Sequence, residues 1–448
     1  MHASRANTPK VASSQKITVY TDGSGLHPGY EEARAGAGVW FGKDDERNRS
    51  IRVPEDLPQT NNSAEALAVL VAVKAVPSRS DLTIHTDSKF VIDSLTSGRE
   101  KAENSDWLLQ SNRAVLEETI GRIRKRKGRT TIKKVKGHSG VEGNEEADRL
   151  AGEGAQKPYG RKFKSRIPKG ERVQGALLSE MTQALLYKGI RRAKATKTLP
   201  RRKTVAGLDA ARHAAKDTVG LTPTDKTLWK STRAKSIPHN RQKEFLWKLA
   251  HDALKCGSFW DGKPGCEHMV NCPTCEVPET AEHTLTDCPS SGQKVIWSLV
   301  GKIMEKRNIP WTAPKIGDIT SCGIAGVRNT ETGKVRTGAS RLRTILIAIS
   351  AHLIWKLRCE WRMGQGGVPD KTHPKREVHN RWVAMVNRII KFDVMAAMSK
   401  GRIRGAPRPA SVLHTWTNTL ENETLLLDCI NGKQWRIEGV LVGIPARG

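Results

Sequence analysis

Cysteine is absent from the first 255 residues of this sequence, and all eight cysteines lie between Cys256 and Cys429. This distribution excludes a disulfide framework spanning the chain and favours a reducing, intracellular setting, either nucleus or cytoplasm. Long hydrophobic runs are also missing, since the most apolar segment, residues 345–349, is bounded by Arg343 and His352. It is far shorter than the roughly 20 residues of a membrane span, and no secretory signal opens the chain, so we expect no membrane association.

Acidic residues are scarce as well. The sequence has 46 Asp and Glu against 76 Lys and Arg, which gives a formal net charge of +30 and an isoelectric point near 10.0. This positive charge indicates a polyanionic partner. An acidic lipid surface is the competing explanation, but the sequence has no lipid-attachment motif. A length of 448 residues predicts two or three domains, and a hydrophobic content of 37% supports buried cores.

Two segments in the first third of the chain predict strands that end at an acidic residue. Residues 17–21 alternate apolar and polar side chains and are followed by Asp22, and residues 82–86 repeat this pattern before Asp87. An open α/β sheet places its active site at the ends of its strands. We therefore expect the two carboxylates to lie close together.

Two further acids and a histidine accompany helix-starting signals. Glu65 lies near the first turn of a helix predicted to run to about residue 76, and Asp148 lies inside a helix that starts near Asn144. His138 is carried on the preceding loop, because the glycines around it disfavour helix. An imidazole near several carboxylates predicts metal-assisted chemistry.

These acids belong to four motifs whose order and spacing resemble the type 1 ribonuclease H family over about residues 16–157. The motifs are Thr21-Asp22-Gly23-Ser24, Thr60-Asn61-Asn62-Ser63-Ala64-Glu65, Thr86-Asp87-Ser88, and Gly137-His138-Ser139-Gly140 continuing to Asn144-Glu145-Glu146-Ala147-Asp148. The resemblance implies an α/β fold with a mixed five-stranded sheet in the order 3-2-1-4-5 and flanking helices. It also implies an endoribonuclease that hydrolyses the RNA strand of RNA–DNA hybrids, with the hybrid as partner.

The same resemblance assigns roles to individual residues. It implies two Mg²⁺ ions, replaceable by Mn²⁺, roughly 4 Å apart. The implied ligands and catalytic residues are Asp22 bridging both ions, Glu65 and Asp87 on the leaving-group side, Asp148 on the water side, and His138 as an accessory proton carrier. The implied substrate contacts are Gly23, Ser24, Thr60, Asn61, Asn62, Asn104 and Asn144.

One part of the family pattern is missing. Cellular members often carry a basic, tryptophan-rich insertion that grips the hybrid, whereas residues 96–104 here are short and contain no tryptophan. Pro58 lies where some relatives place an arginine of a phosphate pocket, and Thr60 and Asn104 are the implied partners in that pocket. We therefore do not expect residues 96–104 to bind the hybrid as that insertion does.

The segments on either side of this domain are polar or basic. Residues 1–15 are predicted to be a disordered tail. Residues 158–225 are predicted to be a basic linker with a helix around residues 174–192, and we expect this linker to bind nucleic-acid backbone without sequence preference. The alternative is a solvated linker whose charge is incidental or serves nuclear import.

The second half contains a pattern typical of a zinc site. Four residues are spaced C-x2-C-x7-H-x4-C, namely Cys272, Cys275, His283 and Cys288. Two cysteines on a tight turn and a distant His/Cys pair can close a tetrahedron around one Zn²⁺, and four filled positions predict a structural metal. Free buried cysteines are the alternative. The residues that could replace one ligand are Cys266, His268 and His251.

The surroundings of this pattern resemble the zinc-binding region at the C-terminal end of LINE-type reverse transcriptases, and we assign residues 226–305 to a zinc-knuckle domain. This second resemblance implies a retroelement-derived protein, although no polymerase motif is visible. The remainder is divided into a linker (306–340), a helical region (341–400), and a basic linker with a small β unit (401–448). In this last part Asn431-Gly432 predicts a hairpin turn.

Three functions follow from these patterns. The first is an active ribonuclease H that works as a monomer. The second is a catalytically silent nucleic-acid-binding protein that uses the basic linker and the zinc knuckle. The third is an integrase or resolvase of the same fold superfamily, which Glu65 and the His138 loop disfavour. The presence of all four acids favours the enzyme.

Overall fold

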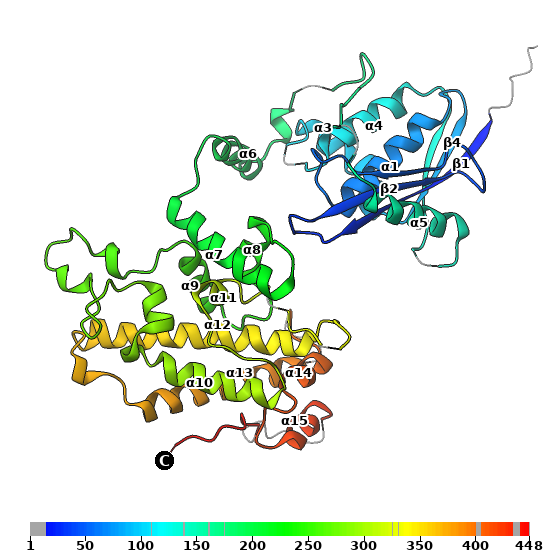
Figure 1. The fold of residues 1–448 in the computed structure, drawn as a ribbon. Helices are drawn as coiled ribbons and strands as arrows, with labels where there is room; N and C mark the ends of the chain where they lie inside the picture. The colour runs from blue at the N-terminus through cyan, green and yellow to red at the C-terminus, as the bar shows by residue number, and fades with distance from the viewer. Residues whose placement is uncertain are drawn as a thin grey trace, which may run out of the picture. The chain divides into compact units, whose positions relative to one another are not determined.

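The computed structural model describes residues 15–108, 110–137, 139–159, 162–173, 175–324, 326–329, 331–399, 405–432 and 440–447. It divides into two compact units, Met1–Leu199 and Pro200–Gly448 (Figure 1). The largest hydrophobic core in each unit is built from residues of that unit alone.

The first unit is built on a sheet of five strands: β1 (Lys16–Leu26), β2 (Arg34–Trp40), β3 (Arg49–Arg52), β4 (Asp81–Thr86) and β5 (Thr130–Lys134). Their order, β3-β2-β1-β4-β5, confirms the predicted sheet. β1 pairs antiparallel with β2 and parallel with β4, so the sheet is mixed. β1 and β4 pair in parallel as far as Tyr20 opposite His85, so residue 22 on β1 lies beside residue 87 just after β4.

The helices of this unit are α1 (Asn61–Ala75), α2 (Lys89–Leu95), α3 (Arg99–Asn104), α4 (Arg113–Lys125), α5 (Glu142–Gln156), η1 (Leu178–Glu180) and α6 (Gln183–Ala195). Small residues on β2 decide which helix covers each face of the sheet. Ala35 and Ala37 pack in the core with α1, whereas the alternating residues Gly36 and Gly38 face α5. A Cβ on Gly38 would lie 2.0 Å from the carbonyl oxygen of Ala147. α1 and α5 therefore cover opposite faces (Figure 1).

Two helices begin later than the sequence predicts. The sequence of residues 106–125 predicts one long helix with a basic end. The observed helix starts as α4 at Arg113, because Asp106 and Trp107 have left-handed φ angles of 47° and 55° that are incompatible with regular helix. The helix expected around residues 174–192 is α6, which starts where the Thr182 side chain accepts a hydrogen bond from the backbone of Leu185.

The second unit is helical, as predicted for the C-terminal region. Its helices are α7 (Arg202–Val219), α8 (Asp225–Ser231), α9 (Asn240–Ala250), α10 (Gln293–Lys306), α11 (Ile316–Thr320), α12 (Thr337–Cys359), α13 (Lys375–Met398), α14 (Pro409–Trp416) and α15 (Glu423–Ile430). Short helical turns are η2 (Gly257–Phe259), η3 (Glu267–Met269), η4 (His283–Asp287), η5 (Pro289–Ser291), η6 (Glu360–Gly364) and η7 (Pro369–Lys371). No helix within the described ranges is long and apolar enough to cross a membrane.

The second unit departs from the predicted boundaries in two places. Residues 200–225, expected to be linker, contain α7, and the expected β unit contains α14 and α15. In the described part of that β unit, the pairing is a single isolated bridge between Leu420 and Val442. One core joins Leu246, Trp297, Trp382 and Val442, so the zinc-knuckle domain, the helical region and the C-terminal segment fold together.

Candidate active site

Three acidic side chains converge where the central strands end. Asp22 lies on β1, Asp87 directly follows β4, and Glu65 lies in the second turn of α1. One carboxylate oxygen from each lies within 4.8 Å of the others. Carboxylates at such separations can share a divalent cation.

Two glycines make this convergence possible. A Cβ on Gly23 would lie 2.5 Å from the backbone nitrogen of Glu65, so β1 approaches α1 only because residue 23 has no side chain. A Cβ on Gly137 would lie 2.5 Å from Oδ2 of Asp87. The loop after β5 therefore comes up against the Asp87 carboxylate.

The acids lie where their negative charges are unfavourable. Burial, together with the charges of the neighbouring acids, Asp148 among them, raises the pKa of Asp22 to about 7. The backbone N–H of Gly23 opposes this effect by donating a 2.7 Å hydrogen bond to Asp22 Oδ1. Burial also raises the pKa of Glu65, with the charge of Asp87 adding to the effect. A divalent cation would relieve this repulsion, so the donor set fits Mg²⁺ or Mn²⁺.

Two neighbours fix the orientation of the Glu65 carboxylate. Asn61 Nδ2 donates to Oε1 at 2.9 Å from the preceding turn of α1, and Ser88 Oγ donates to Oε2. Ser88 is at the same time the N-cap of α2, where it accepts from the backbone of Val91. The sequence motif contains Ser88 but does not reveal its contact with Glu65, because a serine in front of a helix is already explained as a cap.

The fourth predicted ligand, Asp148, lies on α5. Its charge contributes to the raised pKa of Asp22, yet it lies outside the group of three acids that meet within 4.8 Å. Its role as a ligand stays a prediction. His138 lies outside the described residues, so its catalytic role stays a prediction as well.

Comparison with known proteins covers the part of the chain that holds these acids. The family model described as RNase H matches residues 14–156. Ribonuclease H of Hyphomonas neptunium is 34% identical over 110 residues, which make up 24% of this chain and 73% of that protein. This chain belongs to the ribonuclease H family.

Ribonuclease H of Schizosaccharomyces pombe is 38% identical over 148 residues, 32% of this chain and 55% of that protein. Ribonuclease H1 of Rattus norvegicus is 35% identical over 151 residues, 33% of this chain and 52% of that protein. The chain thus spans about half the length of these two curated relatives.

Within this ribonuclease H unit, the predicted substrate contacts differ in accessibility. Gly23 is buried and Asn61 is engaged with Glu65, so both support the acids directly. Ser24 is half-buried and Asn62 is exposed, which leaves both available to a substrate. Asn144 is 3% exposed, and within the described structure its Oδ1 has no hydrogen-bond partner.

Thr60 is linked through the Ser63 hydroxyl to Asn112, and not to the predicted Asn104. Thr60 Oγ1 lies 2.9 Å from Oγ of Ser63, which in turn donates to Oδ1 of Asn112 at 2.7 Å. Asn104 instead ends α3, where its backbone carbonyl accepts a hydrogen bond from Leu177. Sequence reasoning missed Asn112 because it assigned this position to the interior of a helix, whereas Asn112 immediately precedes α4.

The second unit brings together the four predicted zinc ligands, Cys272, Cys275, His283 and Cys288, each with a ligand atom within 4.8 Å of the others. We call this group the Cys₃His cluster. The sulfurs of Cys272 and Cys288 lie 3.8 Å apart, close to the separation of about 3.8 Å that tetrahedral Zn–S bonds of about 2.3 Å produce. Nε2 of His283 is buried and has no hydrogen-bond partner in the described structure. Burial, followed by the charge of Cys272, raises the pKa of Cys288 to about 12. A cation would relieve this repulsion, so the donor set fits Zn²⁺.

Proposed function

We propose that this chain is an endoribonuclease that hydrolyses the RNA strand of RNA–DNA hybrids by two-metal-ion catalysis. The observation that carries the proposal is the meeting of Asp22, Glu65 and Asp87 within 4.8 Å. Membership of the ribonuclease H family supports the reaction type. The net charge of +30 supports a polyanionic substrate.

The residues proposed to hold the two Mg²⁺ ions are Asp22, Glu65, Asp87 and Asp148. When bound there, the ions supply charge neutralisation, an activated water and a stabilised leaving oxygen. The chain's part is to fix the carboxylates in advance: Asn61 and Ser88 hold the two oxygens of Glu65. The exposed side chain of Asn62 is proposed to contact the substrate, and contact with a 2′-hydroxyl would distinguish RNA from DNA.

Cleavage of an end-labelled RNA–DNA hybrid in Mg²⁺ tests the proposal. Asp87→Asn removes a metal ligand and should cost several kcal/mol of transition-state stabilisation, a loss of rate on the order of 10³-fold. Asp93→Asn is the matched control, because Asp93 is an exposed acid on the neighbouring α2 and should leave the rate unchanged. Equal rates for Asp87→Asn and wild type, or hybrid binding without any cleavage, would favour the catalytically silent binding protein.

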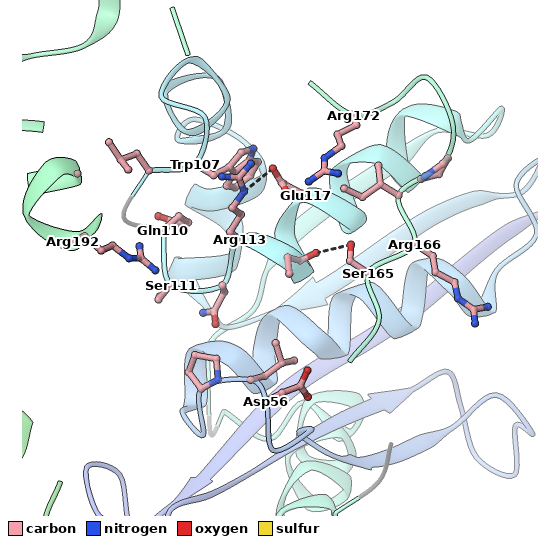
Figure 2. A pocket seen from close by; sticks show the side chains of 18 of the residues that line it. Asp56, Trp107, Gln110, Ser111, Arg113, Glu117, Ser165, Arg166, Arg172 and Arg192 are labelled. Atoms are coloured by element: carbon pink, nitrogen blue, oxygen red, sulfur yellow. Dashed lines mark hydrogen bonds and ion pairs between the residues drawn. The ribbon is translucent and has the colours of Figure 1, made fainter. Parts of the chain in front are cut away.

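We also propose that the basic segment 162–196 grips the hybrid where the family's usual insertion is missing. This segment and α4 border a cavity of about 1020 Å³. The cations that the segment contributes to its lining are Arg166, Lys169, Arg172 and Arg192. Figure 2 shows Arg192 extending into the cavity toward Gln110 and Ser111.

The two acids of this cavity are already engaged. Glu117 pairs with Arg113 at 3.0 Å, and Asp56 accepts a hydrogen bond from the backbone of Phe163 at 2.9 Å. No ion pair is found within the described structure for the four cations that the segment contributes to the cavity, so their charge remains available to phosphates. This supports a phosphate-binding surface on the ribonuclease H unit.

We propose further that the Cys₃His cluster binds one structural Zn²⁺ and that the chain is retroelement-derived. The unpartnered Nε2 of His283 and the close sulfurs of Cys272 and Cys288 support zinc binding by this cluster. The resemblance of the surrounding sequence to LINE-type reverse transcriptases is the reason for proposing a retroelement origin. Elemental analysis should find one zinc per chain in wild type and in Cys266→Ser, and none in Cys275→Ser. Zinc loss in Cys266→Ser instead would show that the ligand set is wrong. Remnants of a reverse transcriptase beside the coding sequence would test the origin.

A further inference from the structure

A second cavity, of about 610 Å³, lies within the helical unit and is bordered by the first turn of α9 and by α12 and α13. Its lining in the described structure includes several cations and no carboxylate. The volume falls in the range of roughly 300–1000 Å³ that is typical of small-molecule sites.

Three exposed cations from three different helices line this cavity. They are Arg241 on α9, Lys356 on α12 and Arg388 on α13. None of them forms an ion pair with an acid in the described part of the chain. Arg381, which also lines the cavity, is already paired with Glu360 at 2.7 Å. The first turn of α9 adds to the positive potential, because His239 gives it no side-chain cap.

The interior of the cavity has a different character. Leu353, Met385 and Ile389 provide an apolar wall. Gln242 is only 7% exposed, and its Oε1 has no hydrogen-bond partner in the described structure. Its Nε2 lies 3.4 Å from Nδ1 of His352, so the oxygen is the group left unsatisfied. A buried amide oxygen without a donor is unfavourable by roughly 1–3 kcal/mol unless a ligand supplies one.

We propose that this cavity binds a nucleotide, with its phosphate among Arg241, Lys356 and Arg388 and its base against the apolar wall. An exocyclic amino group of the base donates to Oε1 of Gln242. The cations alone would accept any phosphate, whereas the apolar wall and the unsatisfied acceptor select a ligand that carries a base. The same chemistry is offered by a free nucleotide and by the 5′-phosphorylated end of a nucleic acid. The site is independent of the three acids in the ribonuclease H unit.

Calorimetric titration of the full chain, without added divalent metal, tests the proposal with AMP, adenosine and inorganic phosphate as probes. AMP should bind more tightly than either adenosine or phosphate, because only AMP uses both halves of the cavity. Arg241→Gln or Lys356→Gln should weaken AMP binding roughly tenfold, the effect of one charge-assisted hydrogen bond. Arg376→Gln is the matched control, since Arg376 is an exposed arginine on α13 outside the cavity.

Gln242→Met separates a binding role from a structural one. It should weaken AMP binding and leave phosphate binding unchanged, while the melting temperature rises because an unsatisfied buried oxygen is removed. AMP binding no tighter than phosphate in wild type, or equal losses in Arg241→Gln and Arg376→Gln, would overturn the proposal.

Competition identifies the source of the nucleotide. Displacement of AMP by a 5′-phosphorylated single-stranded RNA, but not by the same RNA with a 5′-hydroxyl, would assign the cavity to nucleic-acid ends. Displacement by neither RNA would assign it to free nucleotides. Equal displacement by both would mean that backbone charge alone is recognised, which contradicts a nucleotide site.

Discussion

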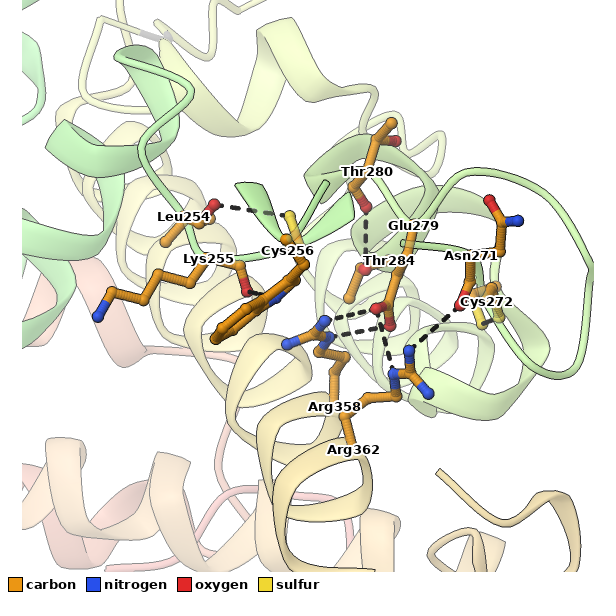
Figure 3. A network of polar contacts seen from close by, with 12 residues as sticks. Leu254, Lys255, Cys256, Asn271, Cys272, Glu279, Thr280, Thr284, Arg358 and Arg362 are labelled. Atoms are coloured by element: carbon orange, nitrogen blue, oxygen red, sulfur yellow. Dashed lines mark hydrogen bonds and ion pairs between the residues drawn. The ribbon is translucent and has the colours of Figure 1, made fainter. Parts of the chain in front are cut away.

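Arg358 and Glu279 form an ion pair deep inside the helical unit, with Nε of Arg358 donating to Oε1 of Glu279 at 2.9 Å. The two side chains are only 3% and 2% exposed. Arg362 donates to the same carboxylate at 3.2 Å and also to the backbone carbonyls of His268 and Asn271 (Figure 3). The Glu279 carboxylate thus joins the end of α12 to the loop between Cys275 and His283 of the Cys₃His cluster.

Glu279→Gln should lower the free energy of unfolding by about 3–5 kcal/mol, because it leaves two buried guanidinium groups without a counter-charge. Urea denaturation in the presence of added Zn²⁺ measures this change. Glu244→Gln is the control, since it breaks the exposed pair of Glu244 with Lys248 at 2.7 Å and should have little effect. Similar losses in the two variants would contradict a special role for the buried pair.

Gly38→Ala should destabilise the ribonuclease H unit by about 2–3 kcal/mol or more, because its Cβ would lie 2.0 Å from the carbonyl oxygen of Ala147 on α5. Gly152→Ala, a substitution on α5 itself, should stabilise the unit by up to about 1 kcal/mol, since a Cβ there meets no described atom within 4 Å. Thermal unfolding followed by circular dichroism compares the two. The two variants should change stability in opposite directions, and a loss of stability in Gly152→Ala would contradict the open space expected around that residue.

Stability of the helical unit should decrease as the pH falls from about 6.5 to about 4. Burial, followed by the charges of Lys356 and Arg241, lowers the pKa of His352 from 6.5 to about 4. Between these values the unfolded chain binds a proton that the folded chain does not, so stability rises with pH across this window, by up to about 3 kcal/mol. Urea midpoints measured at several pH values should depend less on pH in His352→Gln than in wild type. An equally steep dependence in the variant would assign the effect to other groups.

Replacing Arg172 and Arg192 by glutamine should weaken hybrid binding and reduce the slope of log K against log salt by about 2, one phosphate contact for each residue. Fluorescence anisotropy at several salt concentrations measures the slope. An Asp87→Asn background keeps the hybrid intact during the titration. Arg376→Gln should leave the slope unchanged, and an unchanged slope in the double variant would show that the cavity of segment 162–196 does not contact phosphates.

Ser88→Ala should raise the Mg²⁺ concentration needed for half-maximal cleavage by roughly 10–100-fold, because the serine orients the Glu65 carboxylate. Ser88→Thr keeps the hydroxyl and should restore most of the metal affinity. A lower rate with an unchanged Mg²⁺ requirement would point to the N-cap of α2 instead.

The part of the site that could be predicted from sequence depends on local signals. Asp22 and Asp87 each come directly after a visibly alternating run, residues 17–21 and 82–86, and parallel pairing of β1 with β4 then brings the two acids together. The order of the strands came from the resemblance to a family and not from the pattern itself. Ser88 was missed because its contact with Glu65 joins residues from separate elements.

Other failures have equally local causes. The left-handed angles of Asp106 and Trp107 break a pattern that otherwise predicts continuous helix, and Asn112 was misplaced as a result. In the last segment, Asn431-Gly432 is a hairpin signal, yet the buried pair Val412 and Trp416 has the four-residue spacing of a helix. The helical periodicity of the buried residues, and not the two-residue turn signal, determines the structure of residues 409–416.

The common interior that runs from Leu246 to Val442 has an evolutionary consequence. A recombination event that separated the cysteine knuckle from the last helices would strip both pieces of their inside surface, and neither would persist. We therefore expect the segment from Ile237 to Ile444 to be kept or lost as one block, because its shared core cannot be divided.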